Sequence, residues 1–232
     1  MSLPATLSDR TLDRLTAALA LDVAEDVPLV STMSPTPVGR LRVLRPGSTQ
    51  VAKVVTVSLV VPAIGLDSHM IFAFTRPGSA IPHFTLDSVA SAGYHAMHLD
   101  LVPRVELATH LAYLDACFLP LTEPLERAWQ IDGLSPAAVG PRQRAMMSPW
   151  MLVCRATDEA FAKLGPTVET YLEHWLTLVI RGVPPTTGDL AARDQANRAN
   201  LFSPDVDPVW HQVTKLLGEE QAERVRKELV DE

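Results

Sequence analysis

The first part of the chain carries hydrophobic residues at helical spacing. Between residues 8 and 24, leucine and valine recur every three or four positions from Leu12 to Val23, and Ser8 or Thr11 can cap the first turn. This pattern predicts an amphipathic helix over residues 8–24.

From residue 38 to residue 103 the pattern changes to short runs of Val, Ile, Phe and Thr, separated by Gly and Pro-Gly. Such runs are typical of β-strands. The links between the runs hold only a few residues, which is too short for the helical crossovers that parallel strands need. We therefore expect five successive antiparallel strands over 38–103, and a further short strand over 150–155 that rejoins the sheet.

Helical spacing returns after Pro103. We expect helices over 105–129, with interruptions at its prolines, and over 157–230. In the second region Asp158 is the expected cap of one long helix, with Gly165-Pro166 as a kink near its start. The order of helix, antiparallel strands and helices predicts one domain over residues 1–232, with helices covering one or both faces of a sheet.

Charge and hydropathy exclude several classes of function. The chain has 20 Lys and Arg against 27 Asp and Glu, and this net charge of −7 argues against a general binder of nucleic acid or anionic membranes. The longest apolar run, Val54 to Leu66, is too short and too β-branched to cross a bilayer as a helix. The N-terminus lacks the pattern of a secretory signal, so we expect a cytoplasmic protein without a membrane span.

Motifs for bound metals and nucleotides are also lacking. His95 and His98 lie three residues apart in an expected strand, so their side chains point to opposite faces and a shared metal ion is not expected. Cys117 and Cys154 are too few for a disulfide scaffold or an iron–sulfur site. The sequence has no glycine-rich dinucleotide loop, Walker loop or nucleophile elbow. We therefore expect that a ligand or partner brings any redox centre.

One acidic residue is conspicuous within an expected strand. Asp87 lies in the run 81–89, where a carboxylate is unfavourable unless something compensates for it. Strand alternation puts Phe84 and Leu86 on one face, and the other face carries His83, Thr85, Asp87 and Val89. If a pocket covers the second face, desolvation raises the pKa of Asp87 and lets it donate a proton near neutral pH. The alternative is a solvent-facing Asp at a strand end.

Several segments, in order, resemble a known family. They are GLD at 65–67, RPGSAIPHFTLDSV, YHAMHLDLVP, MMSPWMLVCRA and RDQANRANLFSPDVDPVWHQVTKLLGEEQAERVRKELVD, and together they cover about 51–231. This series is similar to the ferredoxin-dependent bilin reductases and their relatives, the red chlorophyll catabolite reductases.

The resemblance implies a fold and an activity. It implies a three-layer α/β/α sandwich built on a central antiparallel sheet. It also implies an oxidoreductase that reduces linear tetrapyrroles, such as biliverdin or chlorophyll catabolites, by a radical mechanism. Single electrons come from reduced ferredoxin, each paired with a proton from the protein, and no metal or flavin is tightly bound.

Carried over by position, the resemblance implies two carboxylates in the site. Asp87 matches the proton-donating aspartate of the family, and Asp207 would face the tetrapyrrole from the helical side, with Asp205 as the alternative. Asp207 also fits a plain helix cap before Pro208. Arg144, and less directly Arg142, could pair with propionate groups of the ligand, although solvated loop arginines need no such role.

The chain also departs from the family. Where phycocyanobilin-forming members have a Glu and a His, this chain has Ser58 and Met70, and neither side chain carries a proton at neutral pH. His83, on the same strand face as Asp87, is the expected second donor. We expect Ser58, Met70 and Phe84 to contribute to substrate binding. The alternatives are a tetrapyrrole carrier or sensor without catalysis, and an enzyme of the same fold that acts on another conjugated metabolite.

A ferredoxin partner is acidic, so its docking surface should be basic. Two groups of arginines fit this requirement. They are Arg40, Arg42 and Arg45 near the first expected strand, and Arg142 and Arg144 in an expected loop.

Overall fold

The protein is described from a computed structural model, which covers residues 1–31, 33–47, 50–91 and 93–231. Residues 48–49 and 92 of the predicted sheet region, and residues 32 and 232 of the predicted domain, lie outside this description. In the described part, no helix has the length and apolar character that crossing a membrane requires.

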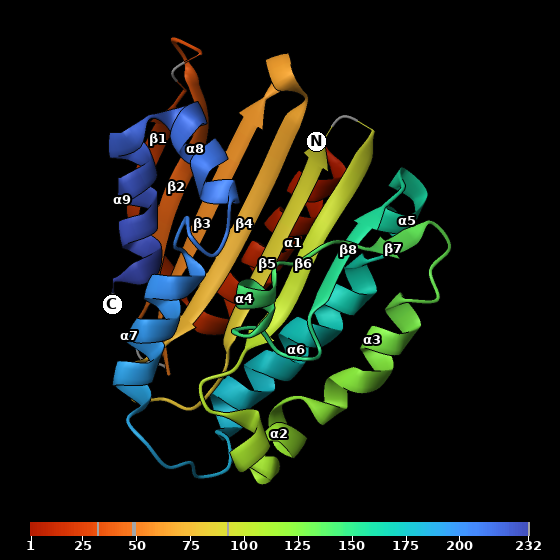
Figure 1. Ribbon diagram of the computed structural model, residues 1–232, viewed down its shortest axis with the longest axis vertical. Helices are drawn as coiled ribbons and strands as arrows, with labels where there is room; N and C mark the ends of the chain where they lie inside the picture. The colour runs from red at the N-terminus through yellow and green to blue at the C-terminus, as the bar shows by residue number, and fades with distance from the viewer. Residues whose placement is uncertain (32, 48–49, 92, 232) are drawn as a thin grey trace.

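An antiparallel sheet runs through the centre of the molecule (Figure 1). In the described residues it has eight strands in the order β1-β2-β3-β4-β5-β6-β8-β7. The strands are β1 (Leu21–Val30), β2 (Pro37–Pro46), β3 (Val51–Val61), β4 (Leu66–Thr75), β5 (His83–Ser91), β6 (Tyr94–Val102), β7 (Leu134–Pro136) and β8 (Leu152–Ala156). The predicted meander of five strands is confirmed as β2 to β6, and the predicted strand over 150–155 is β8.

The helix at the N-terminus begins and ends earlier than predicted. α1 spans Leu3–Leu19, because the Ser2 hydroxyl accepts a hydrogen bond from the backbone N–H of Ala5 and Ala20 adopts a left-handed conformation with φ of 49°. The prediction of a helix over 8–24 was therefore wrong at its end. Val23, assigned to the helix by its spacing, lies in β1.

The later helices are shorter than predicted. They are α2 (Leu111–Cys117), α3 (Thr122–Ala128), α4 (Pro141–Arg144), α5 (Asp158–Ala162), α6 (Gly165–Arg181), α7 (Leu190–Leu201), α8 (Val209–Leu217) and α9 (Glu219–Val230). The single long helix expected from Asp158 is two helices. Thr157, not Asp158, caps α5 through its hydroxyl, and Gly165-Pro166 starts α6 because proline fits the first turn of a helix.

Helices cover both faces of the sheet and confirm the three-layer sandwich (Figure 1). On one face, α1, α2, α3, α5 and α6 pack against the larger hydrophobic core. On the other face, α7, α8 and α9 pack over β2, β3 and β4. Apolar side chains alternate along the central strands between these two cores, so a residue's position in its strand decides which layer it meets.

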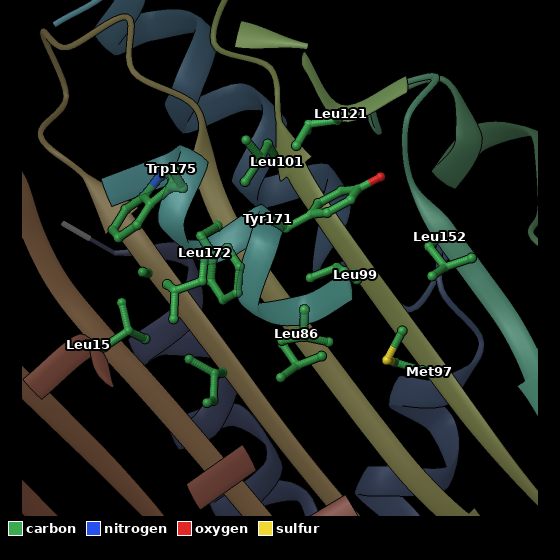
Figure 2. Packing of buried hydrophobic residues seen from close by; sticks show 14 of the residues in the cluster. Leu15, Leu86, Met97, Leu99, Leu101, Leu121, Leu152, Tyr171, Leu172 and Trp175 are labelled. Carbon is green, nitrogen blue, oxygen red and sulfur yellow. The ribbon is translucent and has the colours of Figure 1, made fainter. Parts of the chain in front are cut away.

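The larger core determines which side chains of β5 and β6 point toward α6 and which point toward the other helical layer. Leu86 of β5 and Leu99 of β6 pack toward Tyr171 and Trp175 of α6 (Figure 2). The indole Nε1 of the buried Trp175 also donates a 2.8 Å hydrogen bond to the carbonyl oxygen of Pro82, directly before β5. With these residues held against α6, the intervening residues of both strands point toward the opposite layer.

Candidate functional site

A cavity of about 270 Å³ lies between the sheet and the C-terminal helices, and it is partly open to solvent. Strands β4, β5, β6 and β8 form its floor. The segment 137–151 and the start of α8 form its opposite wall. Its lining residues are Met70, Phe72, Thr85, Asp87, Val89, Ala96, Met97, His98, Ala137, Ala138, Val139, Gln143, Met147, Met151, Val153, Cys154, Leu201, Phe202, Asp207, Val209 and Trp210.

Asp87 lies in the floor of this cavity. Strand register places it between Met70 of β4 and His98 of β6, and all three residues line the cavity. Its Oδ1 atom is buried and has no hydrogen-bond partner among the described residues. Burial raises the pKa of Asp87 to about 7, the negative charge of Asp207 adds to this, and the backbone N–H of Ser88 acts in the opposite direction. Asp87 can therefore hold and release a proton near neutral pH.

Asp207 faces the same cavity from the helical side. Its Oδ1 accepts a 3.0 Å hydrogen bond from the backbone N–H of Val209 at the start of α8, and its Oδ2 accepts one of 3.3 Å from the Gln143 amide. Burial raises the pKa of Asp207. Asp207 lines the cavity as predicted, but it is not the N-cap of α8, because Pro208 holds that position and Asp207 lies one residue before it. Asp205, the alternative, is exposed and does not line the cavity.

His98 is a site residue that sequence reasoning missed. It lies directly across from Asp87 in the β5–β6 pair, and its Nε2 atom is buried without a hydrogen-bond partner among the described residues. Burial lowers the pKa of His98 to about 4, so its imidazole is neutral at pH 7. The signal in the sequence was strand alternation, which gives His98 the parity of the cavity-facing residues of β6.

His95 points to the other face of β6, as predicted. Its Nε2 lies 3.2 Å from a carboxylate oxygen of Asp158, and its ring packs on Phe161. Among the described residues, no three side chains of His, Cys, Asp or Glu are grouped to hold a metal ion.

His83 shares a strand face with Asp87 but does not reach the cavity. Its Nδ1 accepts a 3.0 Å hydrogen bond from the backbone N–H of Thr75, so its proton is on Nε2, which lies 2.7 Å from Oδ1 of Asp194 on α7. Burial lowers the pKa of His83 to about 4. His83 therefore does not lie where a second proton donor beside Asp87 was expected, because α7 covers its side chain.

Ser58 and Phe84 lie on the wrong face of the sheet for this cavity, which corrects their expected role. Phe84 packs against Trp175, with ring centroids 5.8 Å apart, in the core beneath α6. On β3 it is Val57 that belongs to the core on the cavity side, so its neighbour Ser58 points away. Met70, in contrast, lines the cavity as expected.

The arginines expected to bind propionates lie beside the cavity and not inside it. Arg142 and Arg144 are exposed on α4, a short helix where a loop was expected, while Gln143 between them lines the cavity. The Arg142 guanidinium donates a 3.3 Å hydrogen bond to the carbonyl oxygen of Asp205. Together with the Gln143–Asp207 bond, this contact ties α4 to the segment that carries Asp207.

Comparison with solved structures finds phytochromobilin synthase from tomato, crystallised in complex with biliverdin. The TM-score is 0.73 and the sequence identity is 17%, and the match covers 98% of this chain and 82% of that chain. No family model and no curated protein matches the chain. The likeness shows that this chain has the fold of phytochromobilin synthase, and it confirms the fold that the sequence resemblance implied.

Proposed function

We propose that this chain is an oxidoreductase that reduces a linear tetrapyrrole, of the biliverdin or chlorophyll-catabolite type, with electrons from reduced ferredoxin. The observation that carries the proposal is Asp87, a carboxyl group with a raised pKa and an unpartnered oxygen in the floor of the cavity. Phytochromobilin synthase, which shares the fold of this chain, was crystallised with biliverdin, and this supports a tetrapyrrole as the ligand.

The lining of the cavity suits a flat conjugated molecule with few charges inside. Phe72, Phe202 and Trp210 offer aromatic surface, and several methionines offer adaptable apolar contacts. Among the residues that the structure describes, no Lys or Arg lines the cavity. The propionate groups of a tetrapyrrole would therefore lie outside this lining, and Arg142 and Arg144, exposed on α4 beside the cavity, can pair with them.

The proton balance gives each carboxyl group a task. A two-electron reduction of the tetrapyrrole takes two electrons and two protons, and ferredoxin delivers its electrons singly. Protonated Asp87 gives its proton to the ligand after the first electron arrives, and its carboxylate regains a proton from solvent through the open side. Asp207, on the opposite wall, takes up a proton from solvent and passes it to the ligand as the second proton. Its contacts with Gln143 and Val209 hold it in place.

An anaerobic absorbance time course tests the proposal. Biliverdin added to the purified protein should give a bound spectrum that bleaches or shifts blue once reduced ferredoxin is supplied. Asp87→Asn keeps the size of the side chain but cannot donate the carboxyl proton, so binding should persist and reduction should stop after the first electron. Asp205→Asn is the matched control, because Asp205 is exposed outside the cavity, and it should reduce biliverdin as the wild type does.

Two outcomes contradict the proposal. Turnover of Asp87→Asn at the wild-type rate would remove the assigned role of Asp87. The absence of any spectral change when biliverdin is mixed with the wild type would mean that the fold serves another conjugated metabolite.

A carrier or sensor is the second candidate, and Met70 is the observation that favours it. This apolar side chain lies beside Asp87 in the cavity, where phycocyanobilin-forming relatives are expected to have a histidine. A bound biliverdin spectrum that persists with reduced ferredoxin would identify a carrier.

A further inference from the structure

We propose that His98 binds the tetrapyrrole directly through Nε2, beside Asp87, and so holds the ligand against the proton-donating carboxyl group. This inference rests on the proposed function, because it names a second contact residue in the same cavity. His98 occupies the place beside Asp87 that was expected for His83, but its role is to bind the ligand and not to donate a proton.

The first observation is position. His98 and Asp87 are direct cross-strand partners on the same face of β5 and β6, and both line the cavity. Side chains of directly opposed residues in an antiparallel pair have Cβ atoms about 5 Å apart. A ligand group that contacts Asp87 therefore lies within reach of the His98 ring.

The second observation is the lack of internal partners. Buried polar atoms in folded proteins are almost always hydrogen-bonded. In this structure the Asp87 Oδ1 and the His98 Nε2 are both buried without a partner among the described residues. Two such atoms on neighbouring residues, in the floor of one cavity, indicate that a ligand completes their hydrogen bonds.

The third observation concerns the charge state of the ring. Burial alone shifts the pKa of His98, with no contribution from a charged group among the described residues, and it favours the neutral imidazole. A neutral imidazole has one donor nitrogen and one acceptor nitrogen. A linear tetrapyrrole offers pyrrole N–H donors, an imine-type nitrogen and lactam oxygens. Nε2 of His98 can therefore hydrogen-bond to the ligand in either tautomer of the neutral imidazole, and no charge is buried.

The division of labour between the two residues follows from this chemistry. Asp87 changes its protonation state near pH 7, whereas His98 stays neutral over the same range. The imidazole can therefore hold the ligand in the same place before and after Asp87 gives up its proton. His98 acts on affinity and orientation, and Asp87 acts on proton transfer.

Substitution at His98 tests the inference by binding, without any need for turnover. His98→Leu removes both ring nitrogens and leaves a ligand group unpaired, which should weaken biliverdin binding about 10-fold or more. His98→Gln places an amide near the position of Nε2 and should bind within about 3-fold of the wild type. Titration by absorbance gives the dissociation constants, and thermal melting of each variant shows that it is folded.

His95→Leu is the matched control. His95 is on the same strand, packs on Phe161 beneath the opposite layer and does not line the cavity. The variant should bind biliverdin with wild-type affinity. If His98→Leu does not fold, ¹⁵N NMR of the wild type gives the same answer, because adding biliverdin should shift the ring nitrogens of His98 and leave those of His95 in place.

The outcomes separate this inference from the proposed function. Wild-type affinity in His98→Leu, or unchanged ring resonances of His98 in the bound wild type, overturns the inference while the tetrapyrrole site stands. Failure of the wild type to bind biliverdin overturns the proposed function, and the inference fails with it.

Discussion

Asp87 makes the stability of the protein depend on pH in a defined direction. Its pKa is about 7 in the folded chain, compared with 3.8 for an ordinary Asp. Between pH 4 and pH 7 the folded state therefore holds a proton that the unfolded state has lost. Stability from this group is fully present below pH 4 and is lost as the pH rises to about 7, with a slope of at most about 1.4 kcal/mol per pH unit.

Asp87→Asn should remove that dependence. The unfolding free energy of the variant relative to the wild type should increase from pH 4.5 to pH 7 and then level off, because Asn does not titrate. Urea unfolding at several pH values measures the difference. Asp100, whose pKa burial also raises to about 7, is present in both proteins and cancels. A difference that stays constant across this range would mean that Asp87 titrates like a solvated carboxyl group.

Strand alternation is the residue-scale rule that the sequence reveals most clearly. It predicted that Asp87 and Phe84 face opposite layers, and the structure agrees. Alternation cannot show which residues of neighbouring strands lie side by side, because register depends on pairing across the sheet. For that reason the pairing of His98 with Asp87 was missed. The positional match to the family pointed to Ser58 on β3, whereas Val57, one residue earlier, is the cross-strand partner of Met70 on the cavity side.

At the scale of elements, α7 is attached to the sheet by buried charges. Asp194 of α7 accepts the hydrogen bond from His83 and lies 3.4 Å from Arg104 and 3.7 Å from Arg198. Burial opposes the charge of Asp194, but the His83 bond and the two guanidinium groups outweigh it and lower its pKa. The helix ends at Leu201, which lines the cavity, so this attachment also supports the site.

Asp194→Asn should therefore cost about 3–5 kcal/mol of stability, because it removes the negative charge from a buried network of charged and hydrogen-bonded side chains. It should also weaken biliverdin binding by loosening the end of α7. Chemical denaturation and absorbance titration measure the two effects. Asp189→Asn is the control at the N-cap of the same helix, where Asn caps as well as Asp. A loss of less than about 1 kcal/mol in Asp194→Asn would show that the network contributes little to holding α7.

The strands that the sequence did not predict are the two edge strands of the described sheet, β1 and β7. β1 carries Asp22, Glu25 and Asp26 and contains Pro28, and charges and proline are common on edge strands because they discourage further pairing. The same residues hide the alternation that marks a strand. β7 has only three residues, which is too short for any periodicity. Strands β2 to β6 were correctly predicted from their runs of β-branched and aromatic residues and the short links between them.

At the scale of the whole molecule, charge determines how an acidic electron donor can approach. The chain has a net charge of −7, so a uniform surface would repel a ferredoxin. The first arginine group is partly neutralised within the chain, and it does not line the cavity. The guanidinium of Arg40 pairs with the carboxylate of Asp26 at 2.8 Å. Its strand, β2, lies next to the edge strand β1 and three strands away from β5, which carries Asp87. Arg142 and Arg144, in contrast, are exposed beside the cavity.

We therefore expect a ferredoxin to dock at α4, whose exposed arginines lie beside the cavity. The rate of biliverdin reduction at low ferredoxin concentration should fall as ionic strength rises, because salt screens the attraction between the donor and α4. A double variant, Arg142→Glu with Arg144→Glu, should lower the rate and reverse its salt dependence. Arg40→Glu, the control at the other arginine group, should retain the wild-type salt dependence.

The same double variant separates the two roles open to α4. If the arginines pair with propionates, the dissociation constant for biliverdin rises in the absence of any ferredoxin. If they attract the donor, the biliverdin affinity stays the same and only the concentration of ferredoxin needed for half-maximal rate increases. If the double variant loses biliverdin affinity but keeps the salt dependence of the wild type, the docking surface lies elsewhere. In that case the attraction of ferredoxin to the protein does not depend on the arginines of α4.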